Sequence, residues 1–167
     1  MYKKLILIVI VVIMVTGCNR PVTGSGVIST DSKLLSSLKA DAVETLVIGS
    51  NSFVLDAYLW TDLQPSVSEK GKPISSINWL IDKDSVKIPD NINLIKQYVV
   101  YKDSIWMVDY TDEIRPDQPV YRLEKISRDG PEWGPEAYVD VIALIYDSKA
   151  RKNHYIKHQH VLIEQVD

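Results

Sequence analysis

Hydrophobic residues follow two different patterns along the chain. Residues 5–15 form an unbroken apolar run near the start. From residue 44 onward, apolar positions instead alternate with polar ones over short segments, which are separated by Gly, Pro, Asn or Asp. Alternation with a period of two is typical of half-buried strands, so this larger part of the chain is predicted to be a β-domain.

The strand signal is clearest in "SFVLDAYLWTDL", where Phe53, Leu55 and Leu59 fall on one face. The long segment 94–110 is predicted to split into a tight hairpin at Lys102-Asp103. Other predicted strands lie within residues 44–49, 75–81, 120–127, 138–147 and 154–166. About eight strands with so little helical periodicity predict an antiparallel sandwich or barrel. We expect an immunoglobulin-like β-sandwich by fold-level analogy, because the long strands come in hairpin-like pairs.

Two short segments precede the predicted strands. Residues 19–30, "NRPVTGSGVIST", are rich in Gly, Ser, Thr and Pro and predict a flexible tether that reaches about 20 Å. Asp31 or Ser32 can then cap a short helix that ends at Ala42, because apolar residues recur at helical spacing. The apolar stripe of this helix is narrow, so the helix either docks on the domain or stays loose.

Charge and motifs exclude several functions. The 167 residues include 19 Lys and Arg against 22 Asp and Glu, a net charge of −3, without a basic cluster. Nucleic-acid binding depends on neutralising phosphates, so no nucleic-acid partner is expected. The sequence contains no phosphate-binding loop, dinucleotide fingerprint or Gly-x-Ser-x-Gly motif. We therefore expect neither a cofactor nor an enzyme, although a pair of glycosidase carboxylates would leave no local motif.

The first eighteen residues have the pattern of an export signal. Lys3 and Lys4 precede the apolar run, whose eleven residues are too few for a membrane span of about 20. Small residues and Cys18, the only cysteine, follow directly. The segment Val15-Thr16-Gly17-Cys18 resembles the lipobox of bacterial lipoprotein precursors, which commonly has Leu, Ala or Ser, Gly or Ala, and then Cys. Val15 and Thr16 depart from the commonest residues but keep their apolar and small character.

This resemblance implies a lipid anchor. Diacylglycerol would be attached to the Cys18 sulfur, the signal would be cut before Cys18, and the new amino group would usually be acylated. Two or three acyl chains, at about 0.8 kcal/mol per buried methylene, hold a protein stably on a bilayer. Cleavage would remove Lys3 and Lys4, leaving 17 basic against 22 acidic residues, a net charge of −5.

The resemblance also implies a location and a division of the chain. In a cell with two membranes, Asn19 implies the outer membrane facing the periplasm, because Asp usually stands at this position in lipoproteins kept at the inner membrane. In a cell with one membrane, the outer face of the cytoplasmic membrane is implied. The predicted parts are the signal peptide (1–17), the lipidated cysteine with tether and helix (18–43), and the β-sandwich domain (44–167).

The three histidines lie on the last predicted strand. His154, His158 and His160 would share one face, because successive even positions of a strand point the same way. His158 and His160, about 6.6 Å apart, could hold one metal ion weakly, whereas His154, about 13 Å from His158, could not join them. We expect a solvated polar face here, with a weak periplasmic metal carrier as the alternative function.

Acidic and aromatic residues give the remaining candidates. The segment 109–117, "DYTDEIRPD", brings Asp109, Asp112, Glu113 and Asp117 together, but it lacks the ligand spacing of a calcium loop and predicts a solvated connection. Trp60, Trp79 and Trp106 are expected to pack in the core or across strands. Trp133, between two Gly-Pro pairs, is the candidate for contact with a ligand or partner.

The function expected from the sequence is that of a binding or assembly module anchored in the cell envelope by lipid. Its partner would be an envelope protein or a glycan, because aromatic side chains on β-sandwiches can stack against sugar rings. A glycan-directed binding domain or enzyme is the second alternative, beside the metal carrier.

Overall fold

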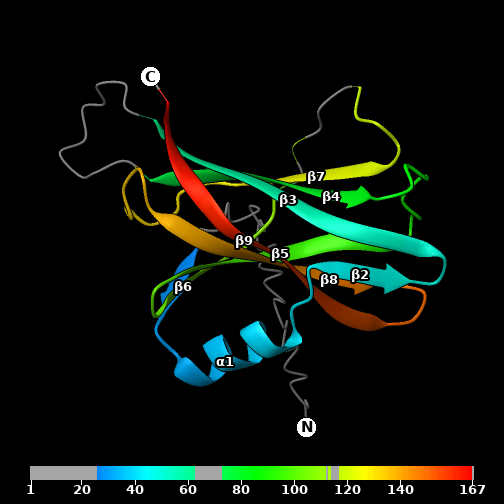
Figure 1. The fold of residues 1–167 in the computed structure, drawn as a ribbon, viewed down its shortest axis with the longest axis horizontal. Helices are drawn as coiled ribbons and strands as arrows, with labels where there is room; N and C mark the ends of the chain where they lie inside the picture. Colours follow the sequence, from blue (N-terminus) through cyan, green and yellow to red (C-terminus); the bar gives the residue numbers. More distant parts are fainter. Residues whose placement is uncertain (1–25, 63–72, 112, 114–116, 167) are drawn as a thin grey trace, which may run out of the picture.

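The computed structural model describes residues 26–62, 73–111, 113 and 117–166. In this part the chain forms nine strands and one helix, which confirms the all-β prediction (Figure 1). The eight predicted strands correspond to β2 through β9. The elements in chain order are β1 (Val27–Ser29), α1 (Ser32–Asp41), β2 (Thr45–Ile48), β3 (Asn51–Asp62), β4 (Ile74–Asp82), β5 (Ile92–Tyr101), β6 (Ser104–Asp109), β7 (Arg122–Ser127), β8 (Tyr138–Asp147) and β9 (Lys152–Val166).

The strands form one large curled sheet in the order β1-β6-β5-β8-β9-β3-β4-β7, and β2 pairs with β3 (Figure 1). One edge of β3 pairs with β4, and the other edge is shared by β2 and β9. The β3–β9 pair is parallel, whereas the other strand pairs of the described residues are antiparallel. The immunoglobulin-like arrangement is therefore not confirmed, because the sheet is continuous, curled like half a barrel, and mixed.

A β-bulge lets β9 take part in both halves of the sheet. Most of β9 pairs with β8, and its last four residues pair with β3. Between these regions the β8–β9 register shifts, so that Gln159 and His160 both lie opposite Asp140. His160 has a φ of 58°, in the left-handed region. Because a bulge bends its strand and increases the local twist, it directs the end of β9 toward β3.

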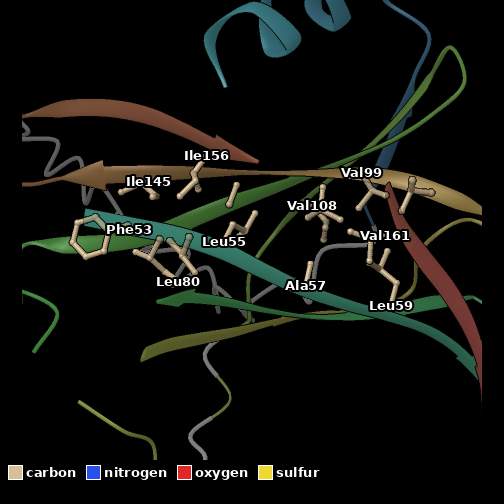
Figure 2. Close-up of a cluster of buried hydrophobic side chains, with 14 of the residues drawn as sticks. Phe53, Leu55, Ala57, Leu59, Leu80, Val99, Val108, Ile145, Ile156 and Val161 are labelled. Carbon is tan, nitrogen blue, oxygen red and sulfur yellow. The ribbon is translucent and has the colours of Figure 1, made fainter. Parts of the chain in front are cut away.

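The main core lies between the two halves of the curled sheet (Figure 2). As the alternation predicts, Phe53, Leu55, Ala57 and Leu59 of β3 all face it. Phe53 and Leu59 are fully buried, and burial of each such side chain stabilises the fold by about 1.5–3 kcal/mol.

The helix α1 docks on the outer face of the sheet. Asp31 caps it as predicted: the Oδ1 atom accepts hydrogen bonds from the N–H groups of Lys33 at 2.8 Å and Leu34 at 3.2 Å. A second hydrophobic cluster joins the helix to β5, β6 and β8, and consists of Leu38, Ala42, Tyr98, Val100, Ile105 and Ile142. Of the two possibilities left open by the sequence, docking is the one observed.

The predicted tether needs a correction at its end. Residues 27–29 form β1, which pairs with residues 105–107 of β6. Gly26 packs against the indole of Trp106, and a Cβ added at Gly26 would lie 2.0 Å from its Nε1 atom. Residues 26–30 thus belong to the domain, while the rest of the predicted tether lies outside the described residues.

Buried polar side chains connect the two halves of the sheet. Gln97 of β5 accepts hydrogen bonds at Oε1 from Ser76 Oγ, at 2.7 Å, and from Asn78 Nδ2, both on β4. All three residues are fully buried. Because a buried polar group is costly when its hydrogen bond is lost, these contacts favour one alignment of β5 over β4.

Two aspartates at strand ends hold the following turns in place. Asp82, at the end of β4, accepts hydrogen bonds from the N–H groups of Asp84 and Val86 and from Asn51 Nδ2. Burial alone would raise the pKa of Asp82, but these three hydrogen bonds outweigh it and lower the pKa. Asp147, at the end of β8, makes corresponding contacts. The N–H of Ala150 and the Asn91 side chain lower its pKa.

We expect acid to destabilise the domain through these two carboxyl groups. A carboxyl whose pKa is lower when folded contributes stability that is present above its unfolded pKa, about 3.9, and is lost as the pH falls through its folded pKa. Denaturant midpoints measured between pH 7 and pH 2 should therefore fall most steeply below about pH 4. Asp82→Asn should flatten this decline, whereas Asp103→Asn, at an exposed turn, should not. Identical profiles for both variants would contradict the assignment.

Candidate functional site

A groove lies between the last turn of α1 and the outer face of β5, β8 and β9. It consists of two adjoining hollows of about 270 Å³ and 190 Å³, which share Lys39, Val100 and Asp140. The first hollow is also lined by Ile142, Lys157 and Gln159, and the second by Lys102, Tyr138 and His160. We call this surface the bulge groove, because the β8–β9 bulge forms one of its walls.

The apolar floor of the bulge groove follows from strand alternation. Val100 of β5 and Ile142 of β8 point to the outer face and belong to the cluster that packs under α1. The helix ends at Asp41, and Lys39 in its last turn reaches the groove. The groove thus lies where the cover supplied by the helix ends, and Val100 and Ile142 beneath it are still almost completely buried, with exposed fractions of 4% and 1%.

The bulge determines the position of His160. Asp140 Oδ1 accepts a hydrogen bond from the His160 backbone N–H at 3.0 Å. The imidazole stacks on the ring of Tyr138, with ring centroids 4.2 Å apart and an interplanar angle of 11°. A positive φ is uncommon for a residue other than glycine, and such conformations cluster at functional sites. Bulges likewise redirect side chains next to binding and active sites.

The bulge groove has a positive charge on a chain that is negative overall. Lys39, Lys102 and Lys157 line it, and Asp140 is its only carboxylate. Among the described residues, none of these three ammonium groups has an ion-pair partner, although Lys102 lies over the Tyr101 ring at 4.8 Å. Unpaired cations around a concave surface attract anions, so the groove is suited to an anionic ligand.

The structure separates His158 from His160. The bulge between them reverses the alternation of β9, so the prediction that all three histidines share one face is wrong. His158 Nδ1 accepts a hydrogen bond from the Ala57 N–H at 3.2 Å and lies 3.5 Å from Asp56 Oδ1. His158 therefore occupies the stretch of the β3 edge between the residues paired with β2 and those paired with β9.

His154 lies on β9 opposite Ile145, away from the bulge groove. Burial, together with the charge of Lys152, lowers the pKa of His154. In the described part of the chain, no three His, Cys, Asp or Glu side chains are grouped so that they could hold a metal ion. His158 and His160 are therefore not placed to bind the same metal ion.

The four tryptophans have different surroundings. Trp106 is fully buried in the main core. Trp60 stacks on Tyr58, with ring centroids 5.5 Å apart, while Trp79 Nε1 donates a hydrogen bond to Glu124 on the neighbouring strand. Trp106 and Trp79 agree with the predicted core and cross-strand packing, whereas Trp60 stacks on a residue of its own strand. Trp133 is partly buried and packs against Tyr101, with centroids 5.4 Å apart, so its contact with a ligand or partner stays a prediction.

The acidic segment does not gather its carboxylates around one point. Asp109 pairs with Lys96 at 3.2 Å, whereas both carboxylate oxygens of Glu113 accept hydrogen bonds from Arg128 at 2.9 Å. Asp117 lies in a turn with a φ of 65°, and Asp112 lies outside the described residues. Asp109 thus interacts with a lysine of β5, and Glu113 with an arginine that directly follows β7. Such separate pairs are expected for a solvated connection.

The lipobox-like segment, residues 15–18, cannot be placed in the fold. Cys18 and the rest of residues 1–25 lie outside the described residues. No helix in the described part of the chain is long and apolar enough to cross a membrane.

The chain matches no family model, no curated protein and no solved structure. Its function must therefore be inferred from the site. Sequence reasoning missed the bulge groove, because its lysines lie on α1, the β5–β6 turn and β9, more than fifty residues apart. The one local signal that could have pointed to it lies near His160, where the alternation of apolar and polar residues along the last strand is interrupted.

Proposed function

We propose that the chain is a lipid-anchored binding module of the cell envelope and that its ligand occupies the bulge groove. The observation that carries this proposal is the set of three lysines that line the groove on a chain with a net charge of −3, none of them with an ion-pair partner among the described residues. The resemblance of residues 15–18 to a lipobox supports the anchor. By the same resemblance, Asn19 supports a location at the outer membrane of a cell with two membranes, and the anchor supports the outer face of the membrane in a cell with one.

Binding fits the bulge groove better than catalysis. The groups there that can transfer protons are His160, Asp140, Tyr138 and the three lysines. Asp140 Oδ1 binds the backbone N–H of His160, and the imidazole stacks on Tyr138. Within the described residues, no carboxylate is hydrogen-bonded to the imidazole, as one is in a His–Asp pair that activates a nucleophile. We therefore propose that the protein is not an enzyme and that the groove holds its ligand unchanged.

The other candidate functions have less support in the geometry. A metal carrier would need His158 and His160 together, and the bulge separates them. A glycan-binding face would need accessible aromatic rings; Tyr58 and Trp60 are partly exposed, but each covers one face of the other, and Arg122 lies over the Trp79 ring. The main core between the two halves of the sheet supports a sandwich-like scaffold, and the immunoglobulin-like form stays a prediction.

Photo-crosslinking in membranes tests whether the bulge groove is the binding site. A photoreactive amino acid at Gln159, in the full anchored chain, should give an adduct that mass spectrometry detects on the intact protein. The adduct should disappear in the double variant Lys39→Glu, Lys157→Glu, because reversed charges repel an anion. The same probe at Lys87, an exposed residue paired with Asp90, is the control and should give no such adduct.

Two results would contradict the proposed binding site. One is the absence of an adduct at Gln159. The other is an adduct that persists after charge reversal, or that forms equally at Lys87, because it would be independent of the cations in the groove.

A further inference from the structure

Resting on the function proposed above, we infer that the bulge groove binds a phosphorylated polyol, with the phosphate at the lysines and a hydroxyl group at Asp140. The three cations, the one carboxylate and the shape of the groove lead to this chemical class of ligand. The two possible sources are the headgroup of a glycerophospholipid and a free glycerol phosphate group.

The number and kind of cations suit phosphate. Lys39, Lys102 and Lys157 are compact point charges with three donors each, which suit a tetrahedral phosphate approached from several directions. Among the described residues that line the groove, three positive charges against the one carboxylate of Asp140 leave a surplus that matches the nearly two negative charges of a phosphate monoester.

The carboxylate in the middle of the groove favours a hydroxyl-bearing ligand. Asp140 would repel a bare anion, but a carboxylate has two oxygens, and the His160 N–H binds only Oδ1. The other oxygen can accept a hydrogen bond from a ligand hydroxyl. The amide of Gln159, which lines the same hollow, can also bind a hydroxyl group. A polyol that carries a phosphate satisfies both the cations and this acceptor.

The size of the groove fits a small headgroup. Each of its two hollows, of about 270 Å³ and 190 Å³, is smaller than the range of about 300–1,000 Å³ typical of sites for drug-sized ligands, so each one suits a small group. Because Val100 and Ile142 beneath the groove are almost completely buried, a glycerol unit would contact mainly the polar side chains that line it. The ligand inferred here is therefore a three-carbon polyol phosphate or a group of similar size.

Calorimetric titration of the full chain in neutral detergent with glycerol 3-phosphate tests this inference. We expect saturable binding that weakens with added salt, and about tenfold weaker binding in Lys39→Gln and in Lys157→Gln. Lys87→Gln is the control and should bind as well as the wild type. Asp140→Asn, whose amide oxygen can still accept the His160 N–H, should reduce the preference for glycerol 3-phosphate over inorganic phosphate.

Reconstitution in nanodiscs distinguishes the two sources. If the natural ligand is a headgroup, phosphatidylglycerol in the disc should compete and weaken the binding of added glycerol 3-phosphate relative to discs of phosphatidylcholine alone. Equal affinity in both discs would assign the site to a free ligand.

Three results would overturn the inference: no binding of glycerol 3-phosphate, unchanged binding in both lysine variants, or equal affinity of the wild type for inorganic phosphate. If one of these occurs while the Gln159 adduct still depends on the lysines, the groove is a binding site for another class of ligand. If the adduct fails as well, the proposed function itself is wrong.

Discussion

Trp106→Ala is expected to lower the free energy of unfolding by about 3–5 kcal/mol, the usual cost of removing a buried indole. Trp106 is fully buried and lies between two glycines of distant segments. A Cβ added at Gly130 would lie 2.8 Å from its Cη2 atom, so the indole fills the space completely. Urea denaturation measures the effect.

Trp60→Ala provides the matched control. Trp60 lies on the outer face of β3, is partly exposed and stacks on Tyr58. We expect this substitution to cost no more than about 1.5 kcal/mol, the scale of an aromatic pair beyond area burial. If both substitutions cost the same, Trp106 does not have the central packing role that its burial indicates.

Elements with local signals could be predicted from the sequence. The alternation around Phe53 and Leu59 gave β3 with its inner face correctly assigned, because that pattern depends only on neighbouring residues. Asp31 was one of the two residues predicted to cap the helix. A cap is a local signal, because its side chain accepts hydrogen bonds from N–H groups only two and three residues ahead. The Lys102-Asp103 turn follows equally from residues close in sequence.

Elements that depend on distant partners could not be predicted. β1 has three residues in a Gly, Ser and Thr-rich segment, and is a strand only because it pairs with β6 almost eighty residues later. The parallel pairing of β3 with β9 likewise joins residues about a hundred positions apart. A period-two pattern gives the face of a side chain but not the neighbour of its strand.

The β8–β9 bulge explains why the candidate site was predicted incorrectly. A regular strand would place His158 and His160 on one face. One extra residue opposite Asp140 reverses this alternation, so that His160 lines the bulge groove while His158 bonds to Ala57. Register along a strand is set by its partner, and the shift at Val139 and Val141 belongs to the β8–β9 pair rather than to β9 alone.

Cys18→Ser should abolish membrane anchoring. If the resemblance to a lipobox is correct, Cys18 is the one acceptor of the diacylglycerol, and the hydroxyl of serine does not replace its thiol. The variant should accumulate as uncleaved precursor or appear in the soluble fraction after its signal is removed. Cell fractionation followed by intact-mass analysis measures both, and the wild type should carry the mass of two or three acyl chains.

The length of the segment between Cys18 and Gly26 also limits the distance between the proposed lipid anchor and the domain. Gly26 packs on Trp106, so only the segment from Cys18 to Gly26 connects the proposed lipid to the fold, and eight residues span at most about 28 Å. Anchoring would thus hold the domain close to the bilayer. Asn19→Asp is the matched variant in a cell with two membranes, because it should keep acylation and move the protein to the inner membrane. Full membrane association of Cys18→Ser after signal cleavage would refute the lipid anchor.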